Sequence, residues 1–202
     1  MIKTKEDLKY YLEQDKLNLK KTEKKPKKYD VIWIYEIVLR KHEYYHNKEK
    51  KNIFDKIKLK HYAKKHRKMT IAYTTSIPIN VCGPGLSIGH IGTIYVNSKA
   101  HVGKNLRIQS GVTVGGAAGK DELPILGDNV YLGAGSKVIG PVKVANNVAI
   151  GANAVVVKSI EEDGTTWGGV PAKKISNNNS WAYIAKEVLT EELKNELYLN
   201  KK

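Results

Sequence analysis

The chain has 202 residues and a formal net charge of +15 at neutral pH, and hydrophobic residues make up 41% of its composition. This length is sufficient for one medium-sized domain, or a small pair, with a substantial hydrophobic core. We expect no membrane-spanning segment and no signal peptide, because no apolar run is long enough and the first residues are charged throughout. The single cysteine excludes an intramolecular disulfide framework.

Positive charge is concentrated in the first third of the chain. Residues 1–70 carry 22 Lys and Arg against 10 Asp and Glu, whereas residues 71–202 carry 13 against 10. A solvated, lysine-rich helical surface explains this bias, and attraction to an anionic membrane or an acidic glycan is the alternative. Nucleic-acid binding is not expected, because arginines are few and no recognition module is present. We predict a cytoplasmic protein and leave peripheral contact with the inner face of the membrane open.

Residues 1–70 are predicted to form an α-helical N-terminal segment. A first helix is expected over residues 4–21 with Thr4 as its N-cap, a second from about Asp30, and a third from Asn52 to about Arg67. These helices would close one end of the domain that follows, where strand edges would otherwise be unpaired.

A six-residue repeat dominates the rest of the chain. Neither an α-helix, with a period of 3.6, nor an alternating strand, with a period of 2, can maintain such a register. A parallel β-helix can, because each hexapeptide forms one flat face of a coil and the stacked coils bury the repeated aliphatic residues. We therefore predict a mainly β solenoid over residues 71–176. The repeated positions are Val96, Val102, Ile108, Val114, Leu126, Leu132, Val138, Val144, Ile150 and Val156.

Two irregular excursions interrupt this pattern, at residues 78–93 and 115–124. Loops that leave a rigid scaffold are frequent positions for binding and catalytic residues. Beyond the repeat, residues 177–202 are predicted to contain a C-terminal helix over about residues 181–199.

His90 is the strongest candidate for a catalytic residue. It lies in the first excursion between Gly89 and Gly92, where a side chain can face a cleft. An imidazole with a pKa near 6.5 can remove a proton from a hydroxyl group at neutral pH. The alternative is a surface histidine without a role.

Two other patterns in the chain have the residue types of known chemical sites. His42, Glu43 and His46 have the spacing of a zinc protease helix, but no third ligand stands at a convincing distance in the sequence, so no metal site is predicted. Cys82 could act as an acyl-carrying nucleophile, although a small buried thiol is the simpler interpretation.

Several motifs resemble those of the hexapeptide-repeat acyltransferases, in particular the serine acetyltransferases and the similar enzymes of capsule and exopolysaccharide loci. The resemblance covers about residues 70–176 and implies a left-handed β-helix, a homotrimer with active sites between subunits, and acetyl-CoA as co-substrate without a metal. The motifs are SIPIN at 76–80, GPGLSIGH at 83–90, QSGVTVGG at 109–116, LGAGS at 132–136, IGANAV at 150–155 and GGVPAK at 168–173.

The resemblance also implies roles for individual residues. His90 matches the general base that takes the acceptor's proton, so that the oxygen attacks the thioester directly. Positions matching cofactor contacts are Gly115, Gly116, Ala134, Gly135, Ala152, Lys158 and Lys173.

The chain departs from the serine acetyltransferase pattern at three positions. Gly89 replaces the family's aspartate before the histidine, Thr75 or Ser76 replaces an orienting aspartate, and Leu123 replaces a second histidine. Because a zwitterionic acceptor needs charged partners, we predict a neutral saccharide acceptor, as in surface polysaccharide synthesis. The alternatives are a serine O-acetyltransferase of cysteine biosynthesis and a catalytically silent scaffold. Residues that could orient His90 or bind the acceptor are Ser76, Asn80, Asp121 and Glu122.

Overall fold

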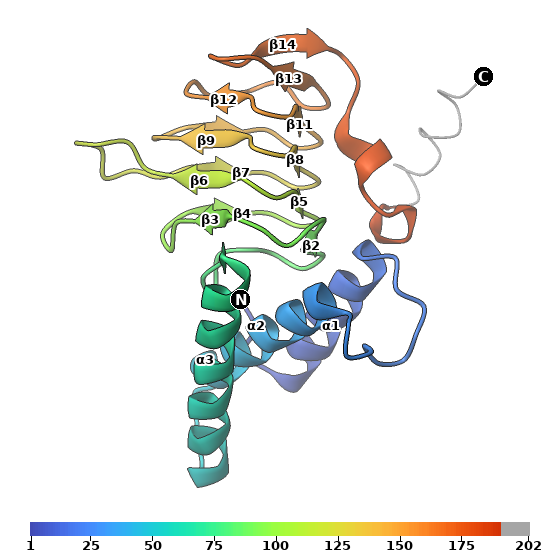
Figure 1. Cartoon of the computed structure of the whole chain (residues 1–202), viewed down its shortest axis with the longest axis vertical. Helices are drawn as coiled ribbons and strands as arrows, with labels where there is room; N and C mark the ends of the chain where they lie inside the picture. The colour runs from blue at the N-terminus through green and yellow to red at the C-terminus, as the bar shows by residue number, and fades with distance from the viewer. Residues whose placement is uncertain (191–202) are drawn as a thin grey trace.

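The computed structural model describes residues 1–190, which form a β-solenoid with a group of helices at one end (Figure 1). The helices are α1 (Lys5–Asn18), α2 (Val31–Asn47) and α3 (Ile53–Tyr73). Thr4 and Asn52 are the N-caps of α1 and α3, as the sequence predicted, and each forms a capping box. No helix in the described part of the chain has both the length and the apolarity needed to cross a bilayer.

The strands of the solenoid form three parallel sheets, and the chain visits the three in turn as it winds. The first sheet contains β1 (Thr75–Ser76), β3 (Ile94–Val96), β6 (Thr113–Gly115), β9 (Lys137–Ile139) and β12 (Val155–Val156). The second contains β4 (His101–Val102), β7 (Ile125–Leu126) and β10 (Lys143–Val144). The third contains β2 (Ser87–Ile88), β5 (Arg107–Ile108), β8 (Tyr131–Leu132), β11 (Ala149–Ile150), β13 (Thr166–Gly168) and, paired antiparallel to β13, β14 (Lys173–Ser176).

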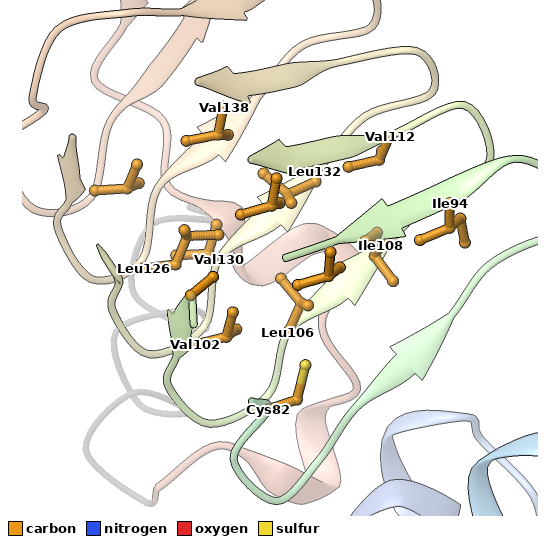
Figure 2. Packing of buried hydrophobic residues seen from close by; sticks show 14 of the residues in the cluster. Cys82, Ile94, Val102, Leu106, Ile108, Val112, Leu126, Val130, Leu132 and Val138 are labelled. Carbon is orange, nitrogen blue, oxygen red and sulfur yellow. The ribbon is translucent and has the colours of Figure 1, made fainter. Parts of the chain in front are cut away.

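The aliphatic residues of the six-residue repeat stack in columns inside the prism (Figure 2). On the third sheet, for example, Ile88 pairs with Ile108, Ile108 with Leu132, and Leu132 with Ile150, and none of the four is more than 2% exposed. The prediction of a left-handed β-helix with a helical N-terminal segment is confirmed. The division of the chain into separate domains at residues 1–70, 71–176 and 177–202 remains a prediction.

Asparagines form a ladder at the corner between the second and third sheets. Asn105, Asn129 and Asn147 have φ values of 58°, 57° and 58°, a left-handed conformation that asparagine tolerates better than most residues. The Asn105 amide donates to Asn129 Oδ1 and the Asn129 amide donates to Asn147 Oδ1, each at 2.8 Å. These bonds join successive coils at a tight turn that the aliphatic pattern alone does not reveal.

The C-terminal helix predicted over residues 181–199 is not present in the described part of this range. Two short 3-10 helices, at Ser180–Tyr183 and Lys186–Val188, occur there instead, and residues 191–199 lie outside the described part. The segment runs from β14 back towards α1, where the Ala185 N–H donates to Asn18 Oδ1 at 3.0 Å. Hydrogen bonds to other elements, such as that from the Trp181 indole to Asn147 Oδ1 at 2.8 Å, hold the segment along this path.

Buried charged side chains join the helices to the first coil. Arg40 is fully buried and donates to the carbonyl oxygens of Cys82 and Gly83 at 2.9 and 2.7 Å. Its guanidinium also pairs with Asp15, at 2.7 Å between Nε and Oδ2. Asp15 Oδ1 in turn accepts from the backbone N–H groups of Gly85 and Leu86, both at 2.8 Å.

Two glutamates of α2 extend this arrangement. Glu43 Oε1 accepts from the Asn80 N–H at 2.6 Å, and Glu36 Oε1 accepts from the Ile88 N–H at 2.9 Å. Burial, and then the nearby charge of Asp15, raises the pKa of Glu36 well above its usual range. The backbone groups of the first coil, which has no preceding coil to pair with, are thus satisfied by side chains from the helices.

Replacing Arg40 with alanine is expected to reduce the free energy of unfolding by about 3–5 kcal/mol, because Asp15 and Glu43 would then be buried without their cation. Urea denaturation followed by circular dichroism measures this change. The control Arg67→Ala, at an exposed position of α3, should change stability by less than about 0.5 kcal/mol. Equal effects of the two substitutions would contradict the interpretation.

Candidate active site

His90 lies at the corner between the third and first sheets, just after β2. Its side chain is exposed in the single chain. The loop is held against the next coil, because the Gly89 N–H donates to the Ile108 carbonyl at 2.7 Å. A Cβ atom at Gly92 would come within 2.9 Å of Ser110 Cβ, so the glycine allows close stacking of the two turns.

Small residues continue this corner along the length of the solenoid. The strand register aligns His90 with Ser110, Ala134 and Ala152, each two residues beyond a paired position of the third sheet. Backbone bonds connect these turns, from Gly135 N–H to Ser110 O at 2.9 Å and from Asn153 N–H to Ala134 O at 2.8 Å. With coils stacked at about 4.8 Å, the edge from His90 to Ala152 is about 14 Å long.

Three of the predicted cofactor contacts, Ala134, Gly135 and Ala152, therefore share an edge with His90, and both alanines are exposed there. Small side chains leave this edge unobstructed for an extended ligand, whose reactive end could reach the imidazole. The roles of these residues are still predictions.

The excursion over residues 115–124 leaves a different corner. Gly115 is buried at the end of β6, while Gly116, Asp121 and Glu122 are exposed on a loop that projects from the prism (Figure 1). This loop connects the first sheet to the second, whereas His90 lies between the third and the first. The strand topology therefore separates this loop from His90 by the width of the first sheet.

The remaining predicted residues lie away from the His90 corner or have other partners. Lys158 follows β12 and Lys173 begins β14, and both are exposed near the far end of the solenoid. Ser76 is half-buried in β1. The Asn80 amide exchanges two hydrogen bonds with Asn47, at 2.6 and 3.0 Å, which gives it a structural contact with α2.

The zinc-protease spacing in α2 has a different explanation in the structure. Glu43 is buried in the charged cluster, and His42 Nδ1 lies 3.2 Å from Nδ1 of His66 in α3. Within residues 1–190, no group of three His, Cys, Asp or Glu side chains could hold a metal ion.

Burial, and then the proximity of His42, lowers the pKa of His66 to about 4. In the unfolded chain this pKa is near 6.5, so between about pH 4 and pH 6.5 the unfolded state binds more protons than the folded state. Stability should therefore decrease as the pH falls through this window.

Urea midpoints at pH 7.5, 6 and 5 should decrease less steeply in His66→Gln than in the wild type. The exposed control His61→Gln should retain the wild-type slope, and parallel slopes in all three proteins would refute this origin.

Cys82 is part of the solenoid core (Figure 2) and is 5% exposed. Burial raises the pKa of its thiol to about 12, so the neutral, unreactive form predominates at physiological pH. The structure supports the interpretation of Cys82 as a core residue.

A thiol-specific chromogenic reagent at pH 8 should leave Cys82 of the native protein unmodified and should modify one thiol per chain in concentrated guanidinium chloride. Rapid modification of the native protein would contradict the buried position.

Two polar residues beside His90 were not identified from the sequence. Arg107 and Gln109 occupy the coil next to the His90 loop, and their outward direction becomes evident only when the register is known. Arg107 contributes to a pocket of about 280 Å³ between β2, β5 and the helical segment. The pocket is lined by Leu19, Lys21, Tyr29, Asp30, Val31, Ile32, Trp33, Ile88, Gly89 and Arg107.

Comparisons with known proteins agree with this architecture. Residues 124–158 match the family described as bacterial transferase hexapeptide (six repeats). A serine acetyltransferase of Mycobacterium tuberculosis is 39% identical over 103 residues, and one of Staphylococcus epidermidis is 41% identical over 92 residues. The matches cover 50% and 44% of this chain, and 44% and 42% of the respective relatives. The chain thus spans less than half the length of these relatives.

Solved structures show the same fold. A serine acetyltransferase from Brucella abortus superposes with a TM-score of 0.68 at 23% identity, covering 87% of this chain and 72% of that one. A serine acetyltransferase in complex with CoA superposes with a TM-score of 0.61 at 21% identity, covering 85% and 71%. The predicted resemblance to hexapeptide-repeat acyltransferases of the serine acetyltransferase type is confirmed.

The prediction of a saccharide acceptor is wrong. The relatives that match at 39–41% identity are serine acetyltransferases, which favours the alternative that the sequence had left open. The prediction rested on the absence of charged partners for a zwitterion, with Gly89, Thr75 or Ser76, and Leu123 at the positions of the family's polar residues. The Gln109 side chain of the neighbouring coil lies beside Gly89, which becomes evident only from the stacking of the coils.

Proposed function

We propose that this chain is an acetyl-CoA-dependent O-acetyltransferase whose acceptor is L-serine. The observation that carries the proposal is the position of His90 at the start of a long edge of small residues, in a chain whose relatives are serine acetyltransferases. These relatives also argue against a catalytically silent scaffold.

The residues of the His90 edge fit the shape of CoA. Ser110, Ala134 and Ala152 leave room for an extended pantetheine arm, and the exposed cations of Lys158 and Lys173 could pair with phosphate groups. Bound acetyl-CoA would supply an acetyl group activated as a thioester.

His90 would act as general base. Its neutral imidazole accepts the proton of the serine hydroxyl as the oxygen forms a bond to the thioester carbonyl carbon. When the tetrahedral intermediate collapses, the carbon–sulfur bond breaks and the imidazolium returns the proton to the CoA sulfur. The products are O-acetylserine and CoA, and the imidazole is again neutral. Direct transfer is favoured over an acyl-enzyme because Cys82 is buried and protonated.

A homotrimer with active sites between subunits is part of the proposal. In one chain His90 is exposed at one corner of the prism, while the loop at residues 115–124 projects from another. Threefold association would allow the loop of one subunit to cover the His90 of the next. A cytoplasmic location is also proposed, whereas the relatives give no support for contact with a membrane or an acidic glycan.

Replacing His90 with alanine is expected to reduce kcat with L-serine by about 10²–10⁴-fold, the usual contribution of a general base. Release of the CoA thiol from acetyl-CoA measures the rate, and O-acetylserine is identified by mass spectrometry. CoA affinity, measured by calorimetry, should remain within about twofold, because the imidazole acts on the acceptor.

His101→Ala is the matched control, since His101 is an exposed histidine of β4 on another face of the prism. It should retain wild-type kinetics. A wild-type protein that does not acetylate L-serine would refute the proposed function, and an active His90→Ala variant would refute the role of His90.

A further inference from the structure

The Gln109 side chain occupies the space beside Gly89. Parallel pairing of β2 and β5 sets Ile88 opposite Ile108, which brings the two following residues into contact. A Cβ atom built at Gly89 would lie 2.2 Å from Gln109 Oε1 and 2.6 Å from Nε2. The carboxamide therefore lies over the backbone of the residue that directly precedes His90, and the absence of a side chain at Gly89 provides the room.

Tyr131 on the next coil lies close to this carboxamide. Burial raises the pKa of the Tyr131 hydroxyl, and its interaction with the Gln109 side chain opposes that shift. The ring of Tyr131 stacks on that of Tyr183 from the C-terminal segment, with centroids 3.8 Å apart and planes inclined by 8°. Gln109 is thus a polar group between Gly89 and an ordered aromatic pair.

Arg107 supplies a cation on the same outer face. Residues two apart in a strand project to the same side, with side chains separated by about 6.5–7 Å. Arg107 Nη1 donates to Ser87 Oγ at 2.5 Å, which fixes the guanidinium in the wall of the 280 Å³ pocket next to Gly89. Arginine remains protonated at neutral pH and presents five donors in a planar fork.

We propose that Arg107 and Gln109 together bind the charged groups of an amino-acid acceptor. The Arg107 guanidinium donates to the α-carboxylate, and Gln109 Oε1 accepts a hydrogen bond from the α-ammonium. The two groups are bonded to one carbon, so Arg107 in β5 and Gln109 just after it can contact both. Arg107 and Gly89 line the 280 Å³ pocket, whereas Gln109 and His90 do not, so the acceptor would extend from the pocket across Gly89 towards the imidazole. This inference rests on the proposed function.

The proposal accounts for recognition of a zwitterion without a carboxylate at position 89. Gly89 leaves room for the Gln109 side chain of the next coil, and the Gln109 carboxamide oxygen is the hydrogen-bond acceptor in that space. The residue that binds the ammonium group is then 20 positions away in sequence and adjacent in space.

Steady-state kinetics of the variants Gln109→Leu and Arg107→Met test this assignment. Each should raise the KM for L-serine about 10- to 100-fold, the loss expected for a hydrogen bond to a charged group. The KM for acetyl-CoA should change by less than about twofold. The KM of Gln109→Glu for L-serine should be equal to or lower than that of the wild type, because a carboxylate accepts a hydrogen bond from an ammonium group more strongly than an amide does.

Acceptor analogues separate the two contacts. 3-Hydroxypropionate retains the hydroxyl and carboxylate but lacks the ammonium, so Gln109→Leu should use it as well as the wild type does. 2-Aminoethanol lacks the carboxylate, so Arg107→Met should use it as well as the wild type does. Arg67→Met, at an exposed position of α3, is the control for loss of an arginine and should leave all constants unchanged.

Three outcomes would overturn the proposal while leaving the proposed function intact. The first is a KM for L-serine that is unchanged in both Gln109→Leu and Arg107→Met while the wild type is active. The second is an equal loss of activity with L-serine and with the truncated analogues. The third is a KM of Gln109→Glu for L-serine that is as high as that of Gln109→Leu. If circular dichroism shows that either variant is unfolded, the conservative variants Gln109→Glu and Arg107→Lys are used for the test instead. Arg107→Lys should retain the positive charge but lose part of the affinity for L-serine. Absence of serine acetylation by the wild type would instead refute the proposed function itself.

Discussion

The open end of the solenoid is the constraint on which the rest of the structure depends. A parallel coil pairs its backbone with the coils on both sides, and the first coil lacks one of these partners. Asp15, Glu36, Arg40 and Glu43 supply the missing donors and acceptors from α1 and α2. Because their charges are removed from water, they are stable only as a mutually compensating group or, for Glu36, with a raised pKa.

The same arrangement positions the candidate active site. His90 belongs to the first coil, which is the one that depends on the helices. Glu36 bonds to the N–H of Ile88, two residues before the imidazole, and Gly89 bonds to the following coil. The corner is therefore fixed from both sides, and the helical segment also lines the pocket that reaches Gly89, the residue before His90.

Much of the fold could be predicted from the sequence because the repeat is local. An aliphatic residue at every sixth position specifies both the coil and the direction of its side chain, so the core followed directly. His90, Ala134 and Ala152 were singled out by the resemblance to known acyltransferases, and the strand register places them on one edge. The path of the C-terminal segment could not be predicted, since it depends on contacts with elements at the opposite end of the prism. The ladder of asparagines was missed because it appears only when coils are stacked.

The acceptor was predicted wrongly for a related reason. In a solenoid, the neighbours of a residue in space lie one coil earlier and one coil later, about 20 positions away. The loss of a carboxylate at Gly89 was interpreted along the sequence, whereas the side chain that fills that space is Gln109, which directly follows β5 in the next coil. Substitutions in such a fold need to be considered across coils as well as along the chain.

The C-terminal segment gives the solenoid a connection that its repeat does not provide. It contacts Asn147 through the Ser180 N–H and the Trp181 indole, and it contacts Asn18 of α1 through the Ala185 N–H. Solenoids held together only by adjacent repeats can fray one repeat at a time from either terminus. Here the C-terminal segment connects a late coil to the first helix, so unfolding at either end of the solenoid would break contacts with the other end. The solenoid is therefore expected to unfold as a single cooperative unit.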